Sequence, residues 1–272
     1  MSIKKQIPNM VILWLFIFSC LPALLLVCLS FMTTDIQHVA KLPFTLTHYQ
    51  QLFDVLFLKI ALRSIILASL TTLICCILAY PFSFFLLGLK NKTLIMILIL
   101  IPFWTSSLIR TFAMVDIVKS HGIINKAFIY FGIIEKPLNL LYTNTTVLLG
   151  LIYNLLPFMI LPIFNAMKTI DLTCIEAAKD LGAGKSQIFF KIFWPQSEAG
   201  VINGCIMVFL PAMTLFFIPN ILGGSKSILI GNLIQNQFLF LNNWPQGAAT
   251  STLLTATLMI LFWVTQTKRR TK

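Results

Sequence analysis

The chain has 272 residues, a mean hydropathy of +0.91, and charged side chains at only 10% of its positions. Soluble domains carry roughly 25% charged residues, so this composition excludes an ordinary soluble protein and indicates an integral membrane protein. The formal net charge is +12, and the placement of the basic residues decides whether it reflects a nucleic-acid partner or membrane topology.

Long uncharged runs recur along the chain, each near the roughly 20 residues that a helix needs to cross a bilayer. The first follows Lys4 and Lys5, and at about 23 residues without a small-residue cleavage site it predicts a retained helix rather than a cleaved signal peptide. The pattern predicts an all-α, polytopic membrane protein with six transmembrane helices: 10–32, 64–89, 93–109, 145–167, 199–222 and 247–266.

The basic residues are distributed unevenly between the loops. With the N-terminus placed in the cytoplasm, the inner segments hold 12 of the 20 Lys and Arg residues, although the outer loops are nearly twice as long. This bias follows the positive-inside rule, so we expect both termini in the cytoplasm, contact with the lipid bilayer, and no nucleic-acid partner. None of the six cysteines falls in an expected outer loop, so no disulfide framework is expected.

The expected outer loop at about 110–144 contains GIINKAFIYFGII, an amphipathic stretch that predicts a short helix on or in the membrane surface. The spans also carry a few polar residues at regular spacing. Asn154 and Asn165, and likewise Asn203 and Thr214, are 11 residues apart, which is about three helical turns. We expect these faces to turn toward the bundle interior, either for hydrogen bonds between helices or to line a passage.

Enzymatic chemistry has little support in the sequence. The three histidines lie in expected outer loops without metal-binding spacing, and no residue pattern supplies an intramembrane nucleophile or a pair of aspartates. GKS at 184–186 matches the end of a phosphate-binding loop, but the first glycine of that motif is replaced by Lys179. We therefore expect no catalytic residue and no metal site. The absence of an acidic residue deep in any span also argues against a proton-driven transporter.

The longest inner loop, 168–197, contains EAAKDLGAGKSQIFFKIFWP. Thr173 and Glu176 fit a capping box, and Gly182 suits a left-handed C-terminal position, which together predict one short helix. Ser186 can cap a second short helix that Pro195 ends. The two helices predict a compact cytoplasmic knob that either docks on another protein or packs beneath its own bundle.

The spacing E-A-A, three residues, G, nine residues, I-x-x-P resembles the EAA loop of permease subunits of binding-protein-dependent, type I ABC importers. In that family the loop is the coupling helix that docks in a groove of a cytoplasmic ATPase. Trp194 departs from the family, which usually has Leu directly before the Pro. The resemblance implies the coupling role for this set of residues: Glu176, Ala177, Ala178, Leu181, Gly182, Ile192 and Pro195.

Four further segments are similar to spermidine/putrescine permease subunits of the same family, over essentially the whole chain: IPFWTSSLIR (101–110), LLPFMILP (155–162), LPAMTLFFIPNILGG (210–224) and WPQGAAT (244–250). The resemblance implies an N-terminal helix with its outer loop (1–63), a permease domain (64–266), and a basic tail (267–272). It also implies a bacterial inner-membrane importer with a PotC-like second permease, a PotA-like ATPase homodimer that uses ATP and Mg, and a PotD-like periplasmic binding protein. No cofactor is expected to bind this chain itself.

A polyamine is a flexible cation that aromatic faces and amide oxygens can attract without holding it tightly. On this basis the candidates for a substrate passage are Trp104, Tyr153, Asn154, Thr214 and Phe217, with ordinary helix packing as the alternative role for each. The substrate rests on the resemblance, because a permease for an amino acid, thiamine or an iron chelate would have the same spans and the same loop. An intramembrane enzyme is the alternative from a different class.

Overall fold

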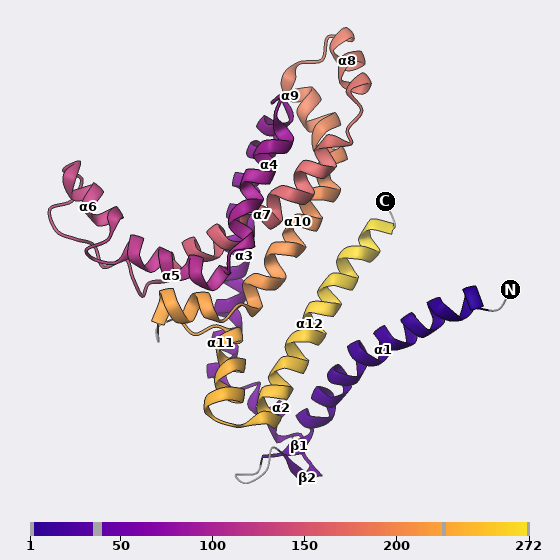
Figure 1. Cartoon of the computed structure of the whole chain (residues 1–272), viewed down its shortest axis with the longest axis vertical. Coiled ribbons are helices and arrows are strands. Elements are labelled where there is room, and N and C mark those ends of the chain that lie inside the picture. The colour runs from indigo at the N-terminus through magenta and orange to yellow at the C-terminus, as the bar shows by residue number, and fades with distance from the viewer. Residues whose placement is uncertain (1–2, 35–39, 225–226, 271–272) are drawn as a thin grey trace. The chain divides into compact units, whose positions relative to one another are not determined.

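The computed structural model describes residues 3–34, 40–224 and 227–270, and most of these residues are helical (Figure 1). Of the basic tail, 271–272 lie outside the described residues. The chain separates into two compact units, one formed by Met1–Ile60 with Leu233–Lys272 and the other by Ala61–Asn232. The last helix, which the sequence groups with the permease domain, packs against the first helix.

The first unit is built on the two terminal helices. α1 (Ile3–Ser30) packs against α12 (Trp244–Arg270), which follows a π-helical turn, η5 (Asn236–Phe240). A two-stranded antiparallel sheet and one short helix follow α1: β1 (Met32–Thr33), β2 (Lys41–Phe44) and α2 (Thr47–Gln51). The hydroxyls of Ser30 and Tyr49 are 2.7 Å apart, so α2 is held against the end of α1.

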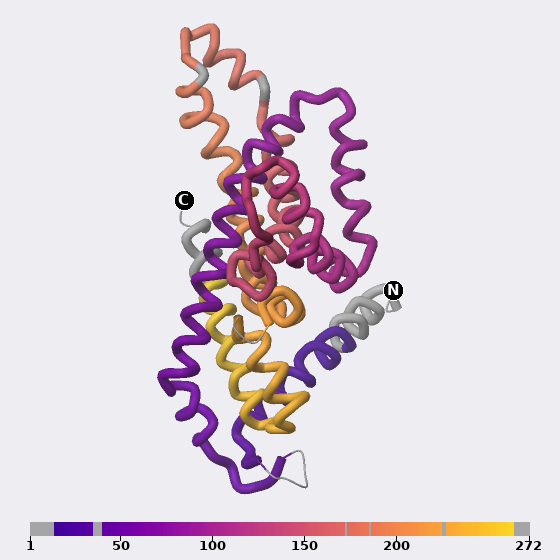
Figure 2. The backbone as a smooth tube through the Cα atoms, turned by 90° about the vertical axis from the view of Figure 1, so that its left-hand side faces the viewer, coloured from indigo at the N-terminus to yellow at the C-terminus, as the bar shows by residue number. Residues whose placement is uncertain are grey.

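The second unit is built on α7 (Asn144–Lys168) and α10 (Trp194–Thr214), which pack along one another (Figure 2). α10 carries Gly200 and Gly204 at G-x-x-x-G spacing, where the small residues let two helices approach closely. A Cβ on Gly200 would lie 2.5 Å from the Cβ of Ala166, and one on Gly204 would lie 2.6 Å from Sδ of Met159. The spacing between α7 and α10 therefore depends on these two glycines.

Three helices among the described residues are long and apolar enough to cross a membrane: α3 (Val55–Leu87), α7, and the continuous helix Ser186–Thr214. A bent pair adds a fourth, and the apolar part of α1, Trp14–Ser30, is shorter. The helical membrane class predicted from the sequence is confirmed. The expected start of the second span at position 64 is wrong, because the apolar residues from Val55 onward continue the helix in front of it.

The third expected span, 93–109, is not one straight helix. α4 (Lys92–Leu100) and a 3₁₀ turn, η1 (Ile101–Trp104), end at Thr105, and the chain then turns by 90° into α5 (Ser107–Val118). Thr105 and Ser106 have ψ angles of 152° and 130°, which no helix accommodates, and Pro102 supplies no amide hydrogen just before them. α6 (Ile123–Tyr130) confirms the short helix predicted in the following loop.

Candidate coupling loop and membrane cavity

α8 (Leu172–Asp180) carries the E-A-A residues and lies at the far end of the α7–α10 pair (Figure 1). Its N-cap is Asp171, because Oδ1 of Asp171 accepts a hydrogen bond from the Thr173 amide at 2.9 Å. The expected capping box at Thr173 is therefore wrong by two positions, since Asp caps a helix at least as well as Thr. The hydrogen bonds from the Thr173 backbone and side chain hold the pKa of the Asp171 carboxyl below its usual value.

The C-terminal end of α8 is closed by backbone hydrogen bonds around Gly182. The Gly182 amide donates to the Lys179 carbonyl and the Ala183 amide donates to the Ala178 carbonyl, both at 2.9 Å. Gly182 has a φ of +78°, the left-handed conformation that this arrangement needs and that glycine adopts without steric cost. The left-handed glycine predicted from the sequence is confirmed.

α8 turns much of its side-chain surface to solvent. Glu176 and Ala177 are exposed, Ala178 is half-buried, and Leu181 is 89% exposed. This side of α8, with the apolar Leu181 side chain beside it, is accessible to another protein. This exposure disfavours the interpretation that the loop packs beneath its own bundle.

The second half of the loop differs from the sequence expectation. α9 (Lys185–Ile188), a π-helical turn, η2 (Phe189–Phe193), and α10 form one continuous helix, so Ser186 does not cap a separate helix and Pro195 does not end it. Proline is tolerated in the first turn of a helix, and here the π-helical turn directly before Pro195 shifts the hydrogen-bond register. Ile192 is half-buried and Pro195 is exposed.

A cavity of about 360 Å³ opens in the second unit, where α5, α7 and α10 meet. Two of the five passage candidates, Asn154 and Phe217, lie in its wall. Trp104 is 89% exposed and Tyr153 is half exposed, and neither lines the cavity. The lining residues are Phe103, Thr105, Ser107, Arg110, Asn154, Leu155, Phe158, Pro211, Leu215 and Phe217.

The polar residues spaced by 11 positions do not all face inward. Asn154 is 3% exposed, but Asn165, Asn203 and Thr214 are exposed in this chain. The Thr214 hydroxyl donates to carbonyls of its own helix, at 3.2 and 3.3 Å. Within this chain the expectation of two interior faces is wrong for these three residues, although α7 and α10 are each continuous helices, because residues on one helical face are covered only where another element packs against that face.

Eight of the ten residues of the cavity wall were not among the sequence-based candidates, and Phe103, Phe158 and Arg110 are three of these eight. The guanidinium carbon of Arg110 lies 4.2 Å from the ring centre of Phe103, and the rings of Phe103 and Phe158 meet edge to face at 5.7 Å. Nε of Arg110 and Oδ1 of Asn154 are buried without a hydrogen-bond partner among the described residues. The segment IPFWTSSLIR contains Phe103 and Arg110, but only the 90° bend brings Arg110 to the cavity.

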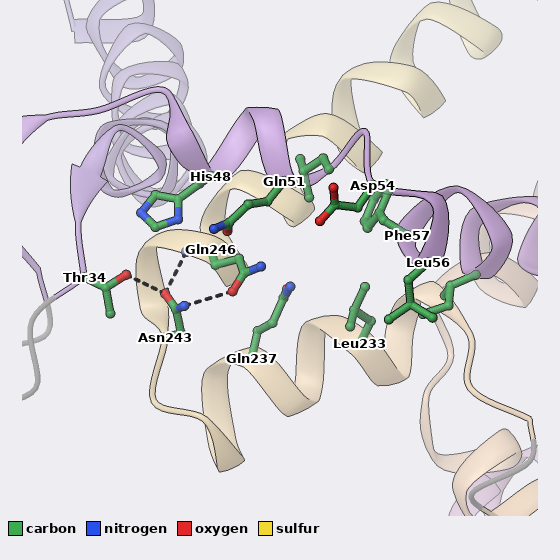
Figure 3. A pocket seen from close by; sticks show the side chains of 12 residues that line it. Thr34, His48, Gln51, Asp54, Leu56, Phe57, Leu233, Gln237, Asn243 and Gln246 are labelled. Carbon is green, nitrogen blue, oxygen red and sulfur yellow. Dashed lines mark hydrogen bonds between the residues drawn. The ribbon is translucent and has the colours of Figure 1, made fainter.

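A second cavity, of about 390 Å³, lies within the first unit (Figure 3). Three of its polar residues bond to one another: the Thr34 hydroxyl donates to Oδ1 of Asn243 at 2.9 Å, and Nδ2 of Asn243 donates to Oε1 of Gln246 at 2.9 Å. Nε2 of His48 bonds to the Met32 carbonyl at 3.1 Å. These bonds join α2 to β1, and they join the residue after β1 to the residue before α12.

The amino-acid sequence matches no family model. It is 40% identical over 255 residues to the spermidine/putrescine transport system permease protein PotB of Escherichia coli K12, covering 92% of this chain and 93% of that protein. The PotB protein of Haemophilus influenzae is 40% identical over 253 residues, with 92% and 88% covered. The inner membrane ABC transporter permease protein YdcU of Escherichia coli is 27% identical over 240 residues, with 83% and 75% covered.

Solved structures show the same fold. A chain of a bacterial ABC transporter that imports the acidic polysaccharide alginate matches with a TM-score of 0.79 and 16% identity, covering 98% of this chain and 96% of that one. A chain from the alginate transporter in complex with an alginate pentasaccharide-bound periplasmic protein matches with a TM-score of 0.78, also at 16% identity. The fold match and the 40% identity over nearly the whole length agree, and this chain belongs to the PotB family of ABC transporter permease proteins.

Proposed function

We propose that this chain is a permease subunit of an ATP-driven importer that carries polyamines such as spermidine and putrescine across the bacterial inner membrane. The supporting observation is the 40% identity to spermidine/putrescine permeases, which extends over 92% of the chain. The chain itself contributes no catalytic residue. ATP and Mg are used by a separate, PotA-like ATPase homodimer.

The ATPase docks on the exposed side of α8. Glu176 and Ala177 offer a polar and a small side chain there, and Leu181 supplies an apolar contact that solvent otherwise surrounds. A homodimeric ATPase has two docking grooves, so a PotC-like second permease supplies the second loop. A PotD-like periplasmic protein delivers the substrate on the opposite side of the membrane. The coupling set is Glu176, Ala177, Ala178, Leu181, Gly182, Ile192 and Pro195.

The cavity beside α5 forms part of the passage. Phe103, Phe158 and Phe217 offer aromatic surface, and the unpaired Oδ1 of Asn154 accepts a hydrogen bond from a substrate ammonium. The fixed positive charge of Arg110 repels that ammonium, so the site guides a polyamine without trapping it. High affinity then resides in the periplasmic protein. Trp104, Tyr153 and Thr214 remain passage candidates that lie outside this cavity wall.

The experiment that tests this function is uptake of labelled spermidine by cells that lack this gene and all other polyamine importers. We expect restoration of the gene to restore uptake, and excess unlabelled putrescine to inhibit it. Cells that carry the vector without the gene are the transport-deficient control. Uptake that stays at background with all partner subunits present refutes the polyamine assignment, and assays with an amino acid, thiamine and an iron chelate then identify the solute.

A further inference from the structure

The coupling loop joins the membrane helices through a π-helical turn. In η2 (Phe189–Phe193) the Trp194 amide donates to the Phe189 carbonyl, five residues back, and the helix continues without a break into α10. π-helical turns are rare and occur frequently at functional sites, because they insert an extra residue that distorts the regular helix. This turn therefore lies at the one point through which the backbone of the loop enters α10.

A single side chain of α3 contacts both ends of this turn. The ring of Tyr80 is centred 5.8 Å from that of Phe189, at the start of the turn, and 5.2 Å from that of Trp194, just after it. The Tyr80 hydroxyl is 2.9 Å from Oγ of Ser197. Because the Ser197 hydroxyl donates its hydrogen to the Trp194 carbonyl at 3.1 Å, Tyr80 is the donor to Ser197.

The contacts of Tyr80 are shielded from solvent, and a second pair of rings supports them. Tyr80 is 8% exposed and Ser197 is fully buried, so the hydrogen bond between them does not compete with water. One turn further along α3, the ring of Phe84 meets that of Phe193 edge to face at 5.1 Å. α3 therefore holds the turn at its beginning, at its end, and beyond Pro195.

α8, by contrast, is loosely seated. A cavity of about 260 Å³ separates it from the turn and from α3, and its wall is formed by Phe84, Ile175, Lys179, Ile188, Phe189 and Phe193. α8 has room to shift when a partner binds its exposed side. A shift can reach α3 through the turn and the rings packed around it.

We propose that Tyr80 is a positioning residue for energy coupling: through Phe189, Trp194 and Ser197 it transmits the displacement of α8 into α3. The proposal rests on the proposed function, because the displacement comes from an ATPase bound at α8. It also accounts for Trp194, where the family usually has Leu. The indole provides an aromatic face for Tyr80 that a leucine does not have.

The first test measures spermidine transported per ATP hydrolysed, in proteoliposomes that contain the complete importer with its binding protein. Tyr80→Leu removes the ring contacts and the hydrogen bond, and we expect the ratio to fall about tenfold while the ATPase rate stays within about twofold. Tyr80→Phe keeps the rings and should lower the ratio about threefold, as should Ser197→Ala. Phe85→Leu is the matched control, since Phe85 lies on the same helix and is 67% exposed, and its ratio should equal that of wild type.

The second test does not depend on the substrate. Hydrogen–deuterium exchange is compared between nucleotide-free and vanadate-trapped importer. In the wild type we expect exchange to change in α8, α10 and α3, and in Tyr80→Leu we expect the change in α3 to be lost. If the importer with Tyr80→Leu does not assemble, the same exchange comparison is made with Tyr80→Phe.

A Tyr80 variant with the wild-type transport ratio and wild-type exchange changes in α3 overturns the proposal. A wild-type importer that moves no spermidine refutes the polyamine assignment instead, and the exchange measurement still decides the role of Tyr80.

Discussion

Gly182 has a left-handed backbone conformation and lies on the docking side of α8. Two substitutions can separate the effect of charge there from the effect of backbone conformation. The Gly182 φ of +78° favours glycine or asparagine, and a Cβ placed there would meet nothing within 4 Å. We expect Gly182→Asp to abolish uptake, because it places a negative charge on the docking side of α8, while insertion into the membrane persists. Gly182→Asn is the matched control: it has the same size and tolerates the left-handed conformation without adding charge, so it should keep most of the uptake. Equal loss in both variants would show that charge is not the cause.

We expect opposite effects on uptake from substitutions of Asn154 and Thr214, although the sequence suggested the same role for both residues. Oδ1 of Asn154 is buried, unpaired and in the cavity wall, whereas the Thr214 hydroxyl bonds to its own helix. We expect Asn154→Leu to lower polyamine uptake about fivefold to tenfold, because a substrate ammonium loses an acceptor. Thr214→Val should leave uptake near wild type. Kinetics of labelled spermidine uptake measure both, and a strong loss in Thr214→Val would contradict the structural assignment.

At the residue scale, the sequence predicted what depends on local backbone chemistry. The left-handed Gly182 follows from its position after a short helix, and the burial of Asn154 follows from the cost of a polar group in lipid. The contribution of Arg110 to the cavity could not be predicted, because it depends on a 90° bend whose direction no local pattern specifies. The exposure of Asn165 and Asn203 could not be predicted either, since the spacing specifies which residues share a helical face but not how far along the helix another element covers that face.

At the scale of elements, the contact between α7 and α10 depends on the absence of side chains on Gly200 and Gly204. In Gly204→Leu the Cβ alone would lie 2.6 Å from Sδ of Met159 and 3.3 Å from the Met159 carbonyl oxygen, and the rest of the side chain would need further space. Overpacking of a close contact costs about 1–3 kcal/mol, so we expect a lower melting temperature in detergent and less assembled importer. Gly184→Ala is the control, since a Cβ there meets nothing within 4 Å. An unchanged melting temperature for Gly204→Leu would contradict this dependence, because either the helices or the Met159 side chain would then move aside without cost.

Hydropathy located the membrane helices but not their interruptions. The average over about 20 residues finds a span whether or not the helix inside it is straight, so the break at Thr105 was invisible to it. The error at Pro195 was the opposite one. There the proline predicted the end of a helix, whereas the helix continues through it. The π-helical turn before it lets the helix continue, and such turns have no sequence signature as clear as a cap.

At the scale of the whole molecule, the distribution of basic residues predicts which side of the membrane each loop faces. Both termini and α8 should lie in the cytoplasm. The segments that contain them have a higher density of Lys and Arg residues than the outer loops. Cys174 offers a native reporter of this arrangement, since it is an exposed free cysteine on α8. Its side of the membrane therefore reports the orientation of the coupling loop.

We expect a membrane-impermeant maleimide to label Cys174 in inside-out vesicles and not in right-side-out vesicles. Cys174→Ser identifies the signal, because label that persists in this variant comes from another thiol, such as the exposed Cys28 on α1. Lys136→Cys, introduced into the Cys174→Ser chain at an exposed site of the expected outer loop, should show the opposite pattern. Labelling of Cys174 from the outside would reverse the whole topology. α8 would then lie outside the compartment that holds ATP, and it could not couple to the ATPase.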